Sequence, residues 1–287
     1  MTQNSNIKKV AAIHDLSCIG RCSLTVIIPV LSAMGIQVCP LPTAILSSHF
    51  GGFSHIASCD FTEYISPFAA SWQQEKVSFE AIYSGFLASE AQIDGVLAAI
   101  DRFAATNPLI LVDPVMGDDG KLYSPYTKSM QEHMRRLVQQ ADVITPNYTE
   151  ACFLLKEAYE TPMSTPEKIH QWLIALSQFG PHKVVITGIP LAGGKLLNAG
   201  YDSVSGEFWQ KVSERIPVSY PGTGDLFASL LLGQLLAQKS LSEAMDQAIQ
   251  FVELAVKKTY EAQTPRREGV LLEKMLPYLL QESVEGQ

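Results

Sequence analysis

Acids, hydroxyls and glycines gather in four short stretches of the sequence: DPVMGDDG (113–120), TPNYTE (145–150), TG (187–188) and PGTGDLF (221–227). Gly222 and Gly224 would let backbone N–H groups point at an anion, and the helix expected after them would add the positive end of its dipole. Asp225, in the first turn of that helix, could accept a proton from an attacking hydroxyl. Carboxylates would repel phosphate unless Mg²⁺ lay between them, usually held through waters. The set indicates phosphoryl transfer from a nucleoside triphosphate with magnesium.

Each stretch also has a purely structural interpretation. Asp225 taken alone could be an acid that stabilises the first turn of a helix. Asn147 and Glu150 have the spacing of a capping box, which is compatible with Glu150 also meeting metal-bound water. Residues 118–120 resemble an ordinary turn. The functional interpretation therefore depends on all four stretches lying together.

Other nucleotide and hydrolase motifs do not fit the sequence. The first predicted strand runs into HDLSCIGRC, which is not the G-x-G-x-x-G of a dinucleotide fold. Gly194 and Lys195 approach a P-loop, but Ile189 stands where its first glycine belongs and Leu196 where Ser or Thr belongs. No G-x-S-x-G pattern of a hydrolase is present.

Composition indicates a globular protein with small-molecule partners. The chain has 287 residues, of which 47% are hydrophobic and 17% charged, so it can bury a sizeable core. A net charge of −8 argues against a nucleic-acid or acidic-membrane partner. The first residues lack the apolar core of a signal peptide, and no apolar run approaches the length of a membrane span. Five scattered cysteines suit reduced thiols in a cytoplasm, and Cys18, Cys22 and His14 lack the further ligands of a zinc site.

Strand and helix patterns alternate along the chain. Strands LILVD, DVIT and KVVIT are apolar throughout, which is typical of parallel strands covered on both faces. The expected fold is one α/β domain over 1–287, with a doubly wound, mainly parallel sheet flanked by helices on both faces. Predicted strands cover 7–13, 36–46, 78–89, 108–117, 141–147 and 182–189, with a β-hairpin over 194–216. Predicted helices cover 23–35, 60–76, 90–107, 127–140, 148–157, 166–178, 224–238, 241–259 and 270–280.

This fold would place the four stretches on one rim. In open parallel sheets, ligands bind outside the carboxyl ends of the strands. Asp113 follows the apolar run 110–112, Thr145 follows the run 143–144, and Thr187 follows the run 184–186. Gly222 and Gly224 are further expected to have conformations or close approaches that a Cβ would obstruct.

The motifs PGTGDLF, DPVMGDDGKLY, TPNYTEA and YSGFLAS together resemble the pyridoxal kinase branch of the ribokinase superfamily, from residue 7 to about residue 260. The resemblance implies a ribokinase-like fold and an ATP-dependent kinase that phosphorylates the 5′-hydroxymethyl group of pyridoxal, pyridoxine or pyridoxamine. It also implies Mg²⁺, a homodimer and a cytoplasmic location, and it leaves a monovalent cation as a further candidate ion.

The resemblance implies roles for particular residues. Asp225 would be the base, in contact with the substrate, and Gly222, Thr223 and Gly224 would form the anion hole. Mg-ATP would be served by five residues: Asp113, Asp118, Thr145, Glu150 and Thr187. Of these, Asp113 and Glu150 would meet Mg²⁺ through water. The substrate would meet Asp15 and His49, and Phe86 would stack on its pyridine ring.

Two residues depart from the pattern of well-known pyridoxal kinases. Asp15 stands where they carry serine, and Phe50 stands where they carry threonine, although the neighbouring His49 matches. Asp15 is expected to face the pyridine ring, with capping of a turn at DLSC as the structural alternative. A nearby branch, the hydroxymethylpyrimidine (phosphate) kinases, ends its anion hole in cysteine, so Asp225 favours a pyridoxal kinase. Pyrimidine kinase activity and a non-catalytic ligand-binding relative stay open as alternatives.

Overall fold

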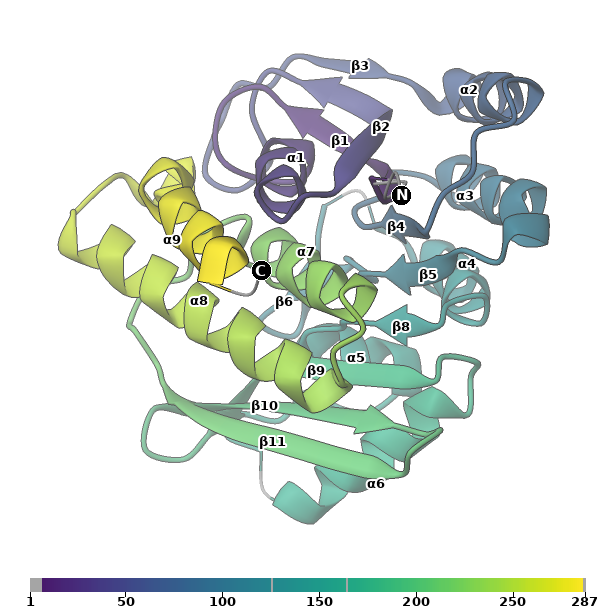
Figure 1. Cartoon of the computed structure of the whole chain (residues 1–287). Helices are drawn as coiled ribbons and strands as arrows, with labels where there is room; N and C mark the ends of the chain where they lie inside the picture. Colours follow the sequence, from purple (N-terminus) through teal and green to yellow (C-terminus); the bar gives the residue numbers. More distant parts are fainter. Residues whose placement is uncertain (1–6, 125, 164, 286–287) are drawn as a thin grey trace.

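The computed structural model describes residues 7–124, 126–163 and 165–285. Its centre is a sheet whose strands lie in the order β11-β10-β9-β8-β5-β4-β1-β2-β3 (Figure 1). Six strands, β2, β1, β4, β5, β8 and β9, pair in parallel, whereas β3, β10 and β11 are antiparallel additions at the two edges. The predicted doubly wound, mainly parallel sheet is confirmed.

The strands have the following bounds: β1 Lys9–Ser17, β2 Gln37–Leu46, β3 Ser58–Asp60, β4 Ala81–Ser84, β5 Leu109–Val112, β8 Val143–Ile144, β9 Lys183–Leu191, β10 Lys195–Asp202 and β11 Glu207–Glu214. Two short strands, β6 Gly117–Asp118 and β7 Lys121–Leu122, form a separate hairpin. The hairpin predicted over 194–216 is β10–β11.

Helices cover both faces of the sheet (Figure 1). One face carries α1 Leu24–Ala33, α7 Thr223–Leu236, α8 Leu241–Glu261 and α9 Leu272–Glu285. The other carries α2 Thr62–Gln74, α3 Glu90–Phe103, α4 Lys128–Val138, α5 Tyr148–Leu155 and α6 Pro166–Ser177. Short 3-10 helices, η1 Ala104–Thr106 and η2 Arg266–Glu268, complete the described elements.

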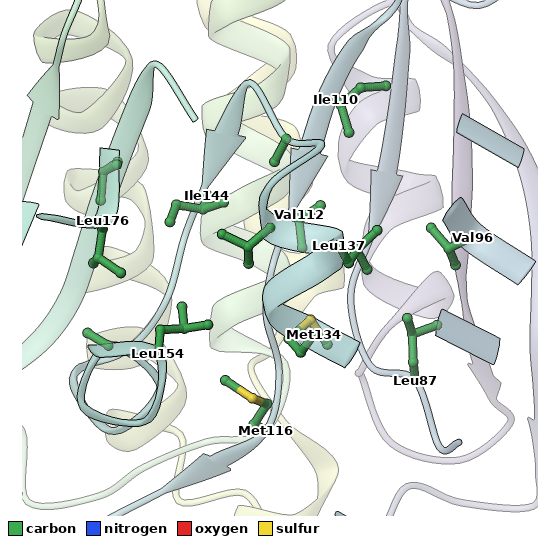
Figure 2. Close-up of a cluster of buried hydrophobic side chains, with 14 of the residues drawn as sticks. Leu87, Val96, Ile110, Val112, Met116, Met134, Leu137, Ile144, Leu154 and Leu176 are labelled. Atoms are coloured by element: carbon green, nitrogen blue, oxygen red, sulfur yellow. The ribbon is translucent and has the colours of Figure 1, made fainter. Parts of the chain in front are cut away.

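Two hydrophobic cores result from the alternation of side chains along the strands. In β5, Leu111 joins the core under α7, while Ile110 and Val112 join the core under α3 and α4. Figure 2 shows part of the second core, in which Met134 and Leu137 of α4 lie over the strands. Burial on both faces explains why the central strands are apolar without interruption.

Several elements differ from their predicted forms. Strand β1 continues to Ser17 because, after an irregularity between His14 and Leu16, the strand pairs again with β2. Strand β3 and the hairpin β6–β7 were not predicted, because an exposed three-residue strand and two-residue strands carry no periodic signal. Within the described ranges, no helix combines the length and apolar character needed to cross a membrane.

Candidate active site

A cavity of about 520 Å³ opens at the carboxyl ends of the parallel strands, beside the start of α7. It is lined by every residue that the sequence singled out for the site: Asp15, His49, Phe86, Asp113, Asp118, Thr145, Glu150, Thr187, Gly222, Thr223, Gly224 and Asp225. The predicted convergence of strand ends therefore occurs in the structure. The individual roles of these residues stay predictions.

Of the two glycines at the start of α7, Gly222 and Gly224, only the first occupies a position that requires glycine. Gly222 has φ +80°, and a Cβ there would lie 2.1 Å from the carbonyl oxygen of Arg21. Gly224 is helical, and a Cβ there would meet only Asp113 Oδ2, at an ordinary 3.7 Å. The expectation of an obstructed Cβ is confirmed for Gly222 and wrong for Gly224, where the protein itself leaves room.

The N-terminus of α7 has no side-chain cap, unlike those of α3, α4, α5 and α8. The first N–H groups of a helix lack partners within the helix, so those of Thr223, Gly224 and Asp225 are available toward the cavity. Together with the helix dipole they form a site suited to an anion. Thr223 contributes through its backbone here, since its hydroxyl donates to the Tyr220 carbonyl at 3.0 Å.

Asp225 is a buried carboxylate with two protein donors. Its Oδ2 accepts the backbone N–H of Ser23 at 2.8 Å and the thiol of Cys22 at 3.5 Å. Burial, with a smaller contribution from the charge of Asp15, raises the pKa of Asp225 to about 6, against the lowering effect of the Ser23 bond. A carboxylate with this pKa is ionised at neutral pH and is a stronger base than an exposed aspartate.

Asp113 and Glu150 are further buried acids at the same rim. Burial and the charge of Asp225 raise the pKa of Asp113 to about 8, and burial and Asp113 raise the pKa of Glu150 well above its usual value. Glu150 Oε2 accepts the Asn147 N–H at 2.8 Å, which completes the predicted capping box, and Oε1 accepts the Met116 N–H at 3.0 Å. This accumulation of acid is a place where a cation would stabilise the ionised forms.

The remaining residues expected to serve ATP come from three different parts of the chain. Thr145 is buried directly after β8, while Thr187 lies within β9, beyond the end of the shorter β8. Asp118 is exposed in the hairpin β6–β7, whose turn residues Asp119 and Gly120 both have positive φ. The turn interpretation of this segment is therefore confirmed, and the turn brings Asp118 to the cavity.

Aromatic side chains form another part of the cavity wall. Phe86 follows β4 and lies 6.2 Å from Phe50, measured between ring centroids, with an angle of 49° between the rings. His49 Nδ1 accepts the Gly51 N–H at 3.0 Å, so Nε2 carries the proton and donates to the Arg267 carbonyl at 2.7 Å. Both ring nitrogens of His49 are thus engaged by the backbone, and its ring packs edge-to-face against Phe53, with 5.1 Å between the ring centroids.

Asp15 lies within β1 and lines the cavity, although it was expected after the end of the strand. Its Oδ1 accepts the Ser23 hydroxyl at 2.6 Å and its Oδ2 accepts the Ser17 hydroxyl at 2.9 Å. It does not cap a turn, because residues 15–17 belong to the strand. Burial raises the pKa of Asp15, while the two hydroxyls act in the opposite direction.

Sequence reasoning missed several residues of the cavity wall, among them Cys22, Ser23 and Arg266. Cys22 and Ser23 precede α1, where serine looks like an ordinary N-cap, but the Ser23 side chain makes no cap bond. Arg266 belongs to η2, in a segment without a recognisable motif, and its Nε donates to the Ser219 carbonyl. It places a cation beside the expected anion site.

Comparisons with known proteins agree with this geometry. The family model described as phosphomethylpyrimidine kinase matches residues 28–268. A Bacteroides thetaiotaomicron protein that carries the provisional name phosphomethylpyrimidine kinase has 42% sequence identity and a TM-score of 0.92, over 97% of this chain and 96% of that one. Pyridoxal kinase from Lactobacillus plantarum has 31% identity and a TM-score of 0.87, over 97% and 98%.

Curated relatives are more distant. Pyridoxal kinase from Arabidopsis thaliana is 28% identical over 215 residues, which are 71% of this chain and 66% of that protein. The fold and site define a ribokinase-like protein, as the sequence motifs indicated. The chain belongs to the phosphomethylpyrimidine kinase family.

Proposed function

We propose that this chain is an ATP-dependent kinase that transfers a phosphoryl group to the 5′-hydroxymethyl group of B6 vitamers: pyridoxal, pyridoxine and pyridoxamine. One observation carries the proposal. A buried carboxylate, Asp225, lies in the first turn of a helix whose N-terminus has no side-chain cap and faces a cavity that Phe86 and Phe50 also line. A base beside an anion site, in a cavity that also offers aromatic rings, is the arrangement that phosphorylation of a ring-bound hydroxymethyl group requires.

In the transfer, the substrate hydroxyl gives its proton to Asp225 while its oxygen attacks the γ-phosphorus of ATP. The bond between that phosphorus and the oxygen of ADP breaks, and the proton stays on the Asp225 carboxyl. The N–H groups of Thr223 and Gly224 stabilise the charge on the moving phosphoryl group, with the dipole of α7 behind them. Gly222 shapes the turn that aims these groups.

The acids on the rim fit magnesium. Asp113 and Glu150 offer hard oxygen ligands, and a divalent cation would offset both the burial and the mutual repulsion that raise their pKa values. Among the described residues, no three His, Cys, Asp or Glu side chains are grouped to hold an ion by themselves. Mg²⁺ would therefore be held through water and ATP oxygens, which is its usual behaviour in kinases. Thr145, Thr187 and Asp118 are proposed to complete the Mg-ATP site.

The vitamer ring is proposed to stack on Phe86, near Asp15 and His49. Two observations on relatives support a B6 vitamer: the Bacteroides protein, 43% identical in its second crystal form, was crystallised with pyridoxal, and the Lactobacillus relative is named pyridoxal kinase. The matched region spans 66% and 57% of the length of two curated pyridoxal kinases.

Hydroxymethylpyrimidine phosphate is the second candidate substrate, favoured by the description of the family model. Hydroxymethylpyrimidine presents a hydroxymethyl group on an aromatic nitrogen ring, as the B6 vitamers do, and could use the same base and anion site. Its phosphate would instead accept the phosphoryl group on a phosphate oxygen, beside the same anion site. We also propose a homodimer in the cytoplasm, following the resemblance to pyridoxal kinases, with the need for a monovalent cation open to measurement.

The test is the rate of ADP formation with ATP and Mg²⁺, measured separately with pyridoxal, pyridoxine, pyridoxamine, hydroxymethylpyrimidine and its phosphate. B6 vitamers should give the highest kcat/KM, and loss of the base in Asp225→Asn should lower turnover by about 10²–10⁴-fold. A preference for a pyrimidine would support the second candidate. ATP binding without turnover of any of these compounds would indicate a non-catalytic relative and overturn the proposal.

A further inference from the structure

Ser23 has a backbone conformation that residues with side chains rarely adopt. Its φ is +53° and its ψ is −131°, at the position just before α1. A positive φ of this kind is uncommon outside glycine and is costly unless the surroundings enforce it. Ser23 is also buried, with 3% of its surface exposed.

Two buried carboxylates hold Ser23 in this conformation. Its backbone N–H donates to Asp225 Oδ2 at 2.8 Å, and its hydroxyl donates to Asp15 Oδ1 at 2.6 Å. A β-bridge to Leu16 fixes the segment from the other side. The unusual backbone thus turns the N–H and the hydroxyl of one residue toward two different acids.

We propose that Ser23 is a positioning residue for the phosphoryl transfer: its strained backbone aims its N–H at Asp225, and its hydroxyl, bound to Asp15, keeps that backbone in place. This inference rests on the proposed function, in which Asp225 is the base. Oδ2 of Asp225 is held by Ser23 and Cys22, so Oδ1 is directed to the substrate hydroxyl.

This arrangement gives Asp15 a role that a turn or a simple strand residue would not have. Asp15 stands where well-known pyridoxal kinases carry serine, which is a shorter partner with a single oxygen. Here the carboxylate binds Ser17 with one oxygen and Ser23 with the other, so it ties β1 to the segment that precedes α1. The substrate side of Asp225 is then oriented from β1 through Ser23.

Stability and activity separate this proposal from a merely structural role. Glycine at position 23 would relieve the backbone strain, but it would remove the hydroxyl and leave the backbone free to move. Alanine would keep the strained backbone and lose only the hydroxyl. A structural residue would lose stability and activity together. If Ser23 is a strained positioning residue, the Ser23→Gly protein should be more stable than the Ser23→Ala protein and should have a lower kcat.

The experiment compares wild type, Ser23→Gly and Ser23→Ala by thermal melting and by steady-state kinetics with ATP and the preferred vitamer. We expect Ser23→Gly to melt above Ser23→Ala, and its kcat to fall by roughly tenfold to a hundredfold, with KM for ATP within about twofold of wild type. Ser23→Ala should retain more of kcat than Ser23→Gly. Lys76→Gly is the matched control: Lys76 also has positive φ, +56°, but is exposed after α2 and should raise the melting temperature without changing kcat.

Three results would overturn the proposal. The first is kcat within about twofold of wild type in both Ser23 variants. The second is a Ser23→Gly variant that melts below Ser23→Ala. The third is loss of ATP affinity in proportion to kcat, which would mean general damage to the site. A wild-type protein that phosphorylates no vitamer or pyrimidine would instead overturn the proposed function, and the melting comparison would still decide whether Ser23 is strained.

Discussion

Replacing Asp225 by asparagine should stabilise the protein while it inactivates the site. The carboxylate is 8% exposed and ionised at neutral pH, although burial raises its pKa from the usual 3.8 to about 6. Since the folded-state pKa is the higher one, the protonated form favours folding. Stability from this group is full below pH 3.8 and is lost as the pH rises through about 6.

The size of the effect follows from the shift. A shift from 3.8 to about 6, at about 1.4 kcal/mol per unit, makes the ionised side chain cost about 3 kcal/mol of folding free energy at pH 8. Asparagine removes the charge and can still accept the Ser23 N–H. For a chain of this size, about 3 kcal/mol corresponds to a rise of about 5 °C in the melting temperature. At pH 5, where the folded wild type is mostly protonated, the gain should fall to about half.

Thermal or denaturant unfolding of wild type and Asp225→Asn at pH 8 and pH 5 measures this difference. Asp94→Asn is a control for net charge, since Asp94 is exposed on α3 and forms only a surface ion pair with Arg136, so it should change stability by less than about 0.5 kcal/mol. An Asp225→Asn protein that is no more stable than wild type at pH 8, or equally stabilised at both pH values, would refute the reasoning.

Other expectations follow from the same site. Because Asp225 must be ionised to accept a proton, kcat should fall as the pH drops through about 6, and a pH–rate profile that is flat between pH 5 and 7 would contradict its role as base. Gly222→Ala should destabilise the fold, because the added Cβ would clash with the Arg21 carbonyl. Gly224→Ala should melt like wild type but raise KM for ATP. Equal melting temperatures for the two variants would contradict this expectation. Asp15→Ser should change the ratios of kcat/KM among the three vitamers by about tenfold, as expected for a charged hydrogen-bonding group, and unchanged ratios would mean that Asp15 serves only Ser17 and Ser23.

The sequence predicted the fold well where burial leaves a pattern. Strands β5, β8 and β9 lie between two cores, so their apolar runs identified them as parallel strands, and their ends located Asp113 and Thr145 on one rim. Strand β3 was missed because Ser58–Asp60 is exposed and has no apolar face. Patterns of hydrophobicity report burial, and an exposed edge strand has little of it.

Site residues were predictable by type and place but not by their bonds. Glu150 was expected as a cap and as an acid near metal, and the capping box is present. The positive φ of Ser23 had no sequence signal, since a serine before a helix ordinarily caps it. Likewise, the open space beside Gly224 depends on how Asp113 packs across from α7, which only the tertiary structure determines.

Helix α7 carries a residue of the candidate site, Asp225, and runs from there through the hydrophobic core. All but three of its 14 residues are buried, so the helix that carries Asp225 in its first turn has almost no solvent face. Evolution within this fold can therefore change α7 only by small, volume-matched steps. Phe50, by contrast, is 55% exposed on a loop beside the same cavity and is free to vary. Substitutions at Phe50 would thus change the wall of the cavity while α7, and with it Asp225, keeps its place.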